Sequence, residues 1–207
     1  MHKFTFIFLI FLILSCTDKT FEKEWTQEQA PKTFIGVFET TKGTFEITVE
    51  RKWSPKAADR LYQLIKHDYY NNGIFYRVVP KFVAQFGNTD TIIMNQWRAV
   101  KIPDEIVKLT NNKGTVSFAR LGKDSRDLEL FINLNNNTTL DTLQFEGVVG
   151  FPAIGMVTSG METVEKLYSG YGEKTMTDPN LYVNRSLFYK THPKLDLIKR
   201  AYLKVSE

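Results

Sequence analysis

The sequence lacks a second cysteine, and histidine is scarce. Cys16 is the single cysteine among 207 residues, so no intrachain disulfide can form. The three histidines, His2, His67 and His192, lie far apart in the sequence, which leaves a zinc or iron–sulfur site without a visible set of ligands. We therefore predict no metal site, and the chemistry has to come from other side chains.

An excess of charge of one sign is also missing. The 27 Lys and Arg residues against 23 Asp and Glu residues give a net charge of +4, and both signs are scattered along the chain. This patterning is typical of an ordinary solvated surface and argues against nucleic-acid binding. We find no internal repeat. The length and the 43% hydrophobic composition are enough for one well-packed domain with additions.

The longest apolar run is too short to cross a membrane as a helix. It covers residues 4–14, interrupted by Thr5, and follows the positive Lys3, which is typical of an export signal. The run leads into ILSC at 13–16, which resembles the bacterial lipobox, in which the cysteine is acylated. We predict a signal peptide over 1–15 and a lipid on Cys16 that anchors the protein to a membrane of a bacterial cell envelope, on its periplasmic or surface face. The alternative is a soluble secreted protein in which Cys16 merely falls at the end of the signal peptide and carries no lipid.

The chain changes character at residue 34. Residues 16–33 are polar and charged with little periodicity, which predicts a tether. From Phe34 on, short apolar segments bounded by Gly and Asn predict strands. These strands cover 34–40, 45–50, 75–79, 82–86, 115–119, 128–133 and 154–158.

Two predicted helices interrupt the strands. Ser54 and Pro55 supply an N-cap and a first-turn proline for an amphipathic helix that ends near Lys66. A second helix is expected from Met161 to Tyr168. Two helices among many short strands favour an antiparallel barrel whose ends are closed by helices, although this pattern alone does not establish a barrel.

Residues 173–207 form a predicted helical extension. A loop is expected at 175–180. Five apolar residues of the final segment recur at helical spacing, namely Leu195, Ile198, Ala201, Tyr202 and Val205. We predict a C-terminal helix that packs on the barrel or on a partner.

The most informative run is FYRVVPKFVAQFGN at residues 75–88. It embeds Arg77 among aromatic and β-branched residues, where desolvating a guanidinium is costly unless it has partners. Arg77 and Gln85 share one face only if the strands around Pro80 keep the two-residue parity of an extended chain. The run resembles the signature of cyclophilin-type peptidyl-prolyl isomerases, F-[HY]-R-[IV]-[IV]-P-x-F-x-x-Q-x-G.

Four further blocks are similar to the same family, in the same order. They are GTVSFAR at 114–120, ELFIN at 129–133, TLD at 139–141, and GFPAIGMV with GME at 150–157 and 160–162. The resemblance covers about Phe34 to Gly170. It implies a mainly β fold, with a closed eight-stranded antiparallel barrel capped by two helices over residues 34–172. It also implies that no cofactor is needed.

The resemblance implies the site residues as well. Arg77 would donate to the twisted amide of an X–Pro bond, and Gln85 would orient its guanidinium through the amide oxygen. The other residues would form a proline pocket and its rim, with the Arg120 backbone pairing with the substrate: Phe82, Val83, Ala119, Arg120, Glu129, Phe131, Leu140 and Phe151. The alternative for Arg77 is a barrel-wall arginine that reaches solvent.

Arginine suits this chemistry because it is always protonated and presents a rigid fork of donors. Rotation about an X–Pro bond breaks amide resonance and crosses a barrier of about 18–20 kcal/mol. The twisted transition state has a pyramidal nitrogen with a free lone pair. A fixed donor aimed at that nitrogen, or at the rotating carbonyl, binds the twisted form better than either planar form.

Three positions depart from the family pattern. Glu129 replaces a glutamine, and its carboxylate is expected to pair either with Arg77 or with Arg120. Thr139 replaces a tryptophan, which predicts weak inhibition by cyclosporin. Phe151 stands in place of a histidine.

Three hypotheses of function follow from these observations. The first is an isomerase that acts on proline-containing unfolded or exported polypeptides and assists their folding, as a monomer. The alternative is a proline-segment binding module or chaperone of low activity, which Glu129, Thr139 and the extension favour. A third hypothesis is a structural lipoprotein that uses residues 173–207 as its contact surface.

Overall fold

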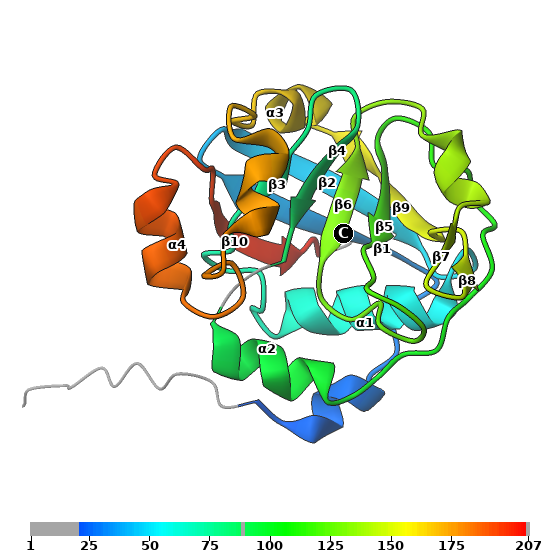
Figure 1. Ribbon diagram of the computed structural model, residues 1–207. Helices are drawn as coiled ribbons and strands as arrows, with labels where there is room; N and C mark the ends of the chain where they lie inside the picture. The colour runs from blue at the N-terminus through cyan, green and yellow to red at the C-terminus, as the bar shows by residue number, and fades with distance from the viewer. Residues whose placement is uncertain (1–20, 88–89, 206–207) are drawn as a thin grey trace, which may run out of the picture.

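An eight-stranded antiparallel sheet forms the body of the computed structural model, which describes residues 21–87 and 90–205 (Figure 1). The strands follow the order β10-β1-β2-β9-β5-β6-β4-β3. Their bounds are Thr33–Thr40 (β1), Gly43–Glu50 (β2), Arg77–Val78 (β3), Val83–Phe86 (β4), Thr115–Phe118 (β5), Leu130–Asn133 (β6), Ala153–Ser159 (β9) and Ile198–Leu203 (β10). A separate hairpin joins β7 (Gln144–Phe145) to β8 (Val148–Val149).

The sheet is open, so the prediction of a closed barrel is wrong, whereas the mainly β, antiparallel architecture is confirmed. The two edge strands are β3 and β10. Within the described residues these edges approach each other at an isolated bridge between Ile74 and Leu197. Two backbone hydrogen bonds accompany this bridge, from Phe75 to Asp196 and from Ile198 to Gly73. No ladder joins β3 to β10 in the described residues, so the sheet remains a half-barrel.

The helix expected after Ser54 is confirmed as α1 (Pro55–Lys66). Leu61 and Ile65 lie on its buried face, which packs into the main core. Strand β1 passes close to this helix at Gly36, where an added Cβ atom would lie 2.7 Å from the Ile65 Cδ1 atom. A larger residue at position 36 would therefore require the Ile65 side chain to move.

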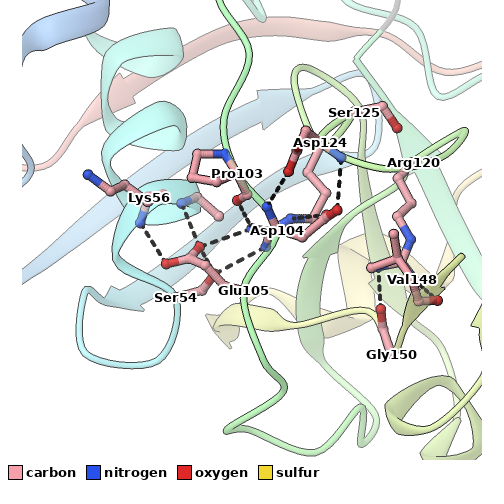
Figure 2. A network of polar contacts seen from close by, with 12 residues as sticks. Ser54, Lys56, Pro103, Asp104, Glu105, Arg120, Asp124, Ser125, Val148 and Gly150 are labelled. Carbon is pink, nitrogen blue, oxygen red and sulfur yellow. Dashed lines mark hydrogen bonds and ion pairs between the residues drawn. The ribbon is translucent and has the colours of Figure 1, made fainter.

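The first turn of α1 is capped by Glu105, not by the expected Ser54 side chain. The Glu105 carboxylate accepts the backbone N–H groups of Lys56 at 3.0 Å and Ala57 at 3.2 Å (Figure 2). Ser54 donates its hydroxyl to the same carboxylate, and buried Arg126 pairs with it at 3.1 Å. A carboxylate suits this position because the helix dipole favours negative charge at the N-terminus.

The other helices are short and lie around the sheet. α3 confirms the second predicted helix but ends before Tyr168. α2 was not expected, because exposed Ile92 and Ile93 interrupt the period set by buried Met94 and Trp97. No helix in the described part of the chain is long and apolar enough to span a bilayer. The bounds are Thr91–Arg98 (α2), Met161–Glu165 (α3), Arg185–Thr191 (α4), and, for 3₁₀-helices, Lys23–Gln27 (η1), Thr138–Asp141 (η2) and Gly172–Thr177 (η3).

Residues 21–33 pack on the domain and do not form the predicted tether. The rings of Phe21 and Trp25 contact the main core, and Trp25 stacks on His67 with ring centroids 4.0 Å apart. These isolated aromatic residues find partners on the folded domain that a polar local composition does not indicate. The remainder of the predicted tether, the predicted signal peptide and Cys16 lie outside the described residues.

The predicted C-terminal helix is wrong, because this segment forms strand β10. It pairs antiparallel with β1, with Tyr202 opposite Val37, and Figure 1 shows it as the red edge of the sheet. A bulge at Lys199 shifts the register, so Ile198 and Ala201 are both buried although they are three residues apart. The bulge therefore mimics helical spacing, and the last part of the chain is integral to the sheet.

Candidate active site

The ten residues predicted to bind or act on substrate all line one pocket of about 400 Å³. A pocket of this size accommodates a small ligand or an amino-acid side chain. The predicted lining residues are Arg77, Phe82, Val83, Gln85, Ala119, Arg120, Glu129, Phe131, Leu140 and Phe151. The sequence did not indicate five others, which are Leu121, Phe145, Glu173, Met176 and Tyr182.

Arg77 and Gln85 are direct partners across the β3–β4 hairpin. The turn at Pro80 and Lys81 keeps the strand parity on which their shared face depends, with Lys81 in the left-handed region. The Arg77 Nη1 atom donates to the Gln85 Oε1 atom at 2.9 Å, which is the predicted contact. The guanidinium also lies over the Phe82 ring, 5.4 Å from its centroid. Arg77 is thus held at the pocket wall with 20% of its side chain exposed.

The floor of the pocket is an apolar cluster separate from the main core. Val83, Phe131 and Leu140 are its buried members. Partly buried Phe82, Ala119 and Phe151 pack against them, and Phe151 meets Phe131 edge to face at a centroid distance of 5.9 Å. The floor therefore offers apolar surface next to the guanidinium of Arg77.

Arg120 uses its side chain to hold the β7–β8 hairpin. Its guanidinium donates to the carbonyl oxygen of Val148 at 3.0 Å and to that of Gly150 (Figure 2). It also lies 4.3 Å from the centroid of the Phe151 ring, and burial lowers the pKa of this guanidinium. Arg120 does not pair with Glu129, because its donors face the hairpin.

Glu129 pairs with neither of the two expected arginines. The Arg98 Nη2 atom of α2 donates to its Oε1 atom at 3.0 Å, and the Tyr182 hydroxyl is a second hydrogen-bond partner. Burial raises the pKa of the Glu129 carboxyl to about 7, and Asp127 adds to this, while Arg98 and Tyr182 oppose it. The unexpected helix α2 therefore explains why the Glu129 carboxylate does not pair with Arg77.

Glu173 is the carboxylate that Arg77 does bind. Its Oε2 and Oε1 atoms accept from the Nε and Nη2 atoms of Arg77, at 2.8 and 2.7 Å. Glu173 belongs to η3, which begins at Gly172 in the left-handed region (φ 53°). No sequence pattern indicated this contact, because Glu173 lies in the predicted extension, 96 residues after Arg77.

A model of the family described as cyclophilin type peptidyl-prolyl cis-trans isomerase/CLD matches residues 35–185. The chain belongs to this cyclophilin family. The match extends beyond the predicted end of the domain at 172 and includes Glu173 and Tyr182. These two residues thus come from a part of the chain that the cyclophilin domain spans.

Individual relatives support the same assignment. The chain is 32% identical over 130 residues to a peptidyl-prolyl cis-trans isomerase of Acinetobacter baylyi, covering 62% of this chain and 68% of that protein. It is 30% identical over 130 residues to peptidyl-prolyl cis-trans isomerase A of Dickeya dadantii, covering 62% of this chain and 67% of that protein. The predicted membership in an enzyme family of peptidyl-prolyl isomerases is confirmed.

Solved structures share the cyclophilin fold at low sequence identity. A crystal structure of a Cryptosporidium parvum cyclophilin type isomerase aligns with a TM-score of 0.59 at 18% identity, covering 84% of this chain and 99% of that chain. A second structure of that protein, in the presence of the dipeptide Ala-Pro, gives a TM-score of 0.58 at 18% identity, with 83% and 99% covered. These alignments confirm the fold.

A polar network lies beside the loop after Arg120, whose Leu121 lines the pocket of this cyclophilin domain (Figure 2). Asp104 and Asp124 each accept the backbone N–H of the other at 2.8 Å. Buried Arg126 forms an ion pair with Asp104 at 3.4 Å and donates to the Pro103 carbonyl oxygen at 2.7 Å. These contacts fix the loop that follows Arg120.

Thr139, which stands where the resemblance implies a tryptophan, does not line the pocket. It is exposed in η2, next to the buried floor residue Leu140. The weak inhibition by cyclosporin that this departure implies stays a prediction.

Proposed function

We propose that this protein catalyses cis–trans isomerisation of X–Pro peptide bonds. The observation that carries the proposal is the Arg77 guanidinium, held 2.9 Å from Gln85 at the wall of an apolar pocket. The proline ring would enter the pocket floored by Val83, Phe131 and Leu140. Arg77 would donate to the amide nitrogen or carbonyl of the twisted bond, which stabilises the transition state over both planar states.

Peptides that contain proline are the proposed substrates. The apolar floor beside a guanidinium suits a proline ring next to a polar backbone carbonyl. The Cryptosporidium parvum structure in the presence of Ala-Pro supports this substrate class for a protein of the same fold. Turnover needs neither proton abstraction nor a covalent intermediate, so one fixed donor and a shaped pocket are sufficient for the chemistry.

The proposed site of action is the cell envelope. The apolar run at 4–14 and the ILSC sequence at 13–16 support export followed by acylation of Cys16. Exported polypeptides would then be the clients, and the isomerase would be held at a membrane surface as they fold.

A proline-segment binding module is the second candidate function. The bidentate contact of Glu173 with Arg77 favours it, because this carboxylate partly neutralises the charge that the twisted amide requires. Slow turnover with retained peptide binding would support this alternative.

The test measures isomerisation of a short X–Pro peptide by a chain that starts at residue 17. This chain keeps every described element of the fold. We expect Arg77→Ala to lower kcat/KM by about 10²- to 10³-fold, the usual effect of removing one preorganised donor. The matched control is Arg200→Ala. It removes an exposed arginine of β10 that pairs with Glu39 of β1. Equal activity of wild type and Arg77→Ala would contradict the proposed function.

A further inference from the structure

Arg77 is engaged on two sides before any substrate arrives. One edge of its guanidinium, formed by Nε and Nη2, is taken by the Glu173 carboxylate, and Nη1 donates to Gln85. A guanidinium has five N–H donors, so at least three are already in use. A substrate carbonyl that approaches the occupied edge has to compete with Glu173.

The two partners of Arg77 differ in how easily they can be displaced. Gln85 is buried in β4 and fixed by the sheet. Glu173 has 58% of its side chain exposed and lies on the short helix η3. Because the Glu173 carboxylate is largely exposed, water can solvate it when it leaves Arg77, so a substrate carbonyl can take its place on the guanidinium.

Glu173 stays at the pocket after release, because the segment that carries it is anchored at several points. Thr175 and Leu181 are buried, and Leu181 belongs to a cluster with Ile74 and Phe188. Tyr182 contacts Glu129 inside the pocket. Once displaced, the carboxylate is therefore an unpaired negative charge beside the bound peptide.

We propose that Glu173 is a specificity-determining residue that selects proline segments by charge. This proposal rests on the proposed function. A Lys or Arg next to the proline of the substrate replaces Arg77 as the partner of the displaced carboxylate. A substrate Asp or Glu in that place is repelled by Glu173 and competes with it for Arg77. The site therefore favours basic proline segments over acidic ones.

The test uses three pairs of peptides, with Lys, Ala or Glu as the varied residue. In one member of each pair this residue precedes the proline, and in the other it follows the proline. We expect wild type to show a kcat/KM roughly tenfold higher for Lys than for Glu peptides, as expected for partly screened charge contacts. Glu173→Gln should reduce this ratio to about twofold and raise kcat/KM for the Ala peptide about threefold. Glu173→Lys should invert the preference.

Glu162→Gln provides the matched control. It removes the same charge from an exposed position on α3, outside the pocket lining, and should keep the wild-type ratio. An unchanged ratio of Lys to Glu peptides in Glu173→Gln would overturn the inference while leaving the isomerase intact. If every variant, wild type included, matches Arg77→Ala in activity, the proposed function fails instead. Dissociation constants of the same peptides, measured by NMR titration, then decide whether Glu173 selects by charge.

Discussion

At the scale of single residues, folding changes the pKa of the Glu129 carboxyl. It is 7% exposed, and burial raises the pKa of its carboxyl to about 7, against an ordinary value of 4.5. The folded protein therefore holds this proton more tightly than the unfolded chain does. The resulting stabilisation is present in full below about pH 4.5 and is lost as the pH rises through about 7.

We expect the free energy of unfolding to fall by up to about 3 kcal/mol between pH 5 and pH 8 through this group. Urea denaturation at several pH values measures this slope. Glu129→Gln lacks the titrating carboxyl, so its free energy of unfolding should fall less over the same interval. Parallel slopes for the two proteins would show that Glu129 is ionised throughout the interval and would contradict the prediction.

The residues of the pocket show which parts of a site a sequence can reveal. Arg77 and Gln85 lie within one hairpin, so a short motif contains both residues and the turn that aligns them. Glu173 has no such local signal, because its position depends on how the chain returns to β3 after the whole sheet has formed. The partner of Glu129 was missed for a related reason, since Arg98 belongs to a helix with exposed isoleucines.

At the scale of secondary-structure elements, the predicted and the observed fold differ most at β10, where a helix was expected. A C-terminal helix would place Ile198 and Val205 on one apolar face, as their spacing suggests. In the strand, Ile198 is fully buried beside β1, whereas Val205 lies beyond β10 and is 87% exposed. The two residues are therefore expected to differ sharply in their contribution to stability.

We expect Ile198→Ala to lower the free energy of unfolding by about 2–5 kcal/mol, because it leaves a cavity in the main core. Val205→Ala should change it by less than about 0.5 kcal/mol, as exposed substitutions usually do. Thermal or urea unfolding of both variants measures the difference. Similar losses for the two variants would favour the helix over the strand.

At the scale of the whole molecule, the sequence blocks identified the sheet and most of its strands but did not predict the packing of residues 21–33 or the strand at 198–203. Alternating apolar residues and the Lys42-Gly43 turn give local patterns for β1 and β2, which are confirmed. The outer segments have weak local patterns because their partners are distant in sequence. Trp25 stacks on His67 at the end of α1, and Tyr202 pairs with β1, so both segments acquire structure from the domain they cover.

This packing of the N-terminal segment constrains how the proposed lipid would orient the protein. Between Cys16 and Phe21 the sequence has four residues, 17–20, whose fully extended length is about 14 Å. From Phe21 on, the chain is held against the core near α1 and α2 (Figure 1). A lipid on Cys16 would therefore hold the η1 side of the molecule close to the bilayer, with α3 on the far side.

We expect a fluorophore on Lys23→Cys to be quenched by doxyl-labelled lipids in vesicles that carry the acylated protein. The same label on Lys166→Cys, an exposed site next to α3, should be quenched several-fold less. Because acylation would occupy Cys16, each variant offers one free thiol for the label. Equal quenching at the two positions would mean that residues 21–33 detach from the domain at the membrane and act as the flexible spacer that their polar composition suggests.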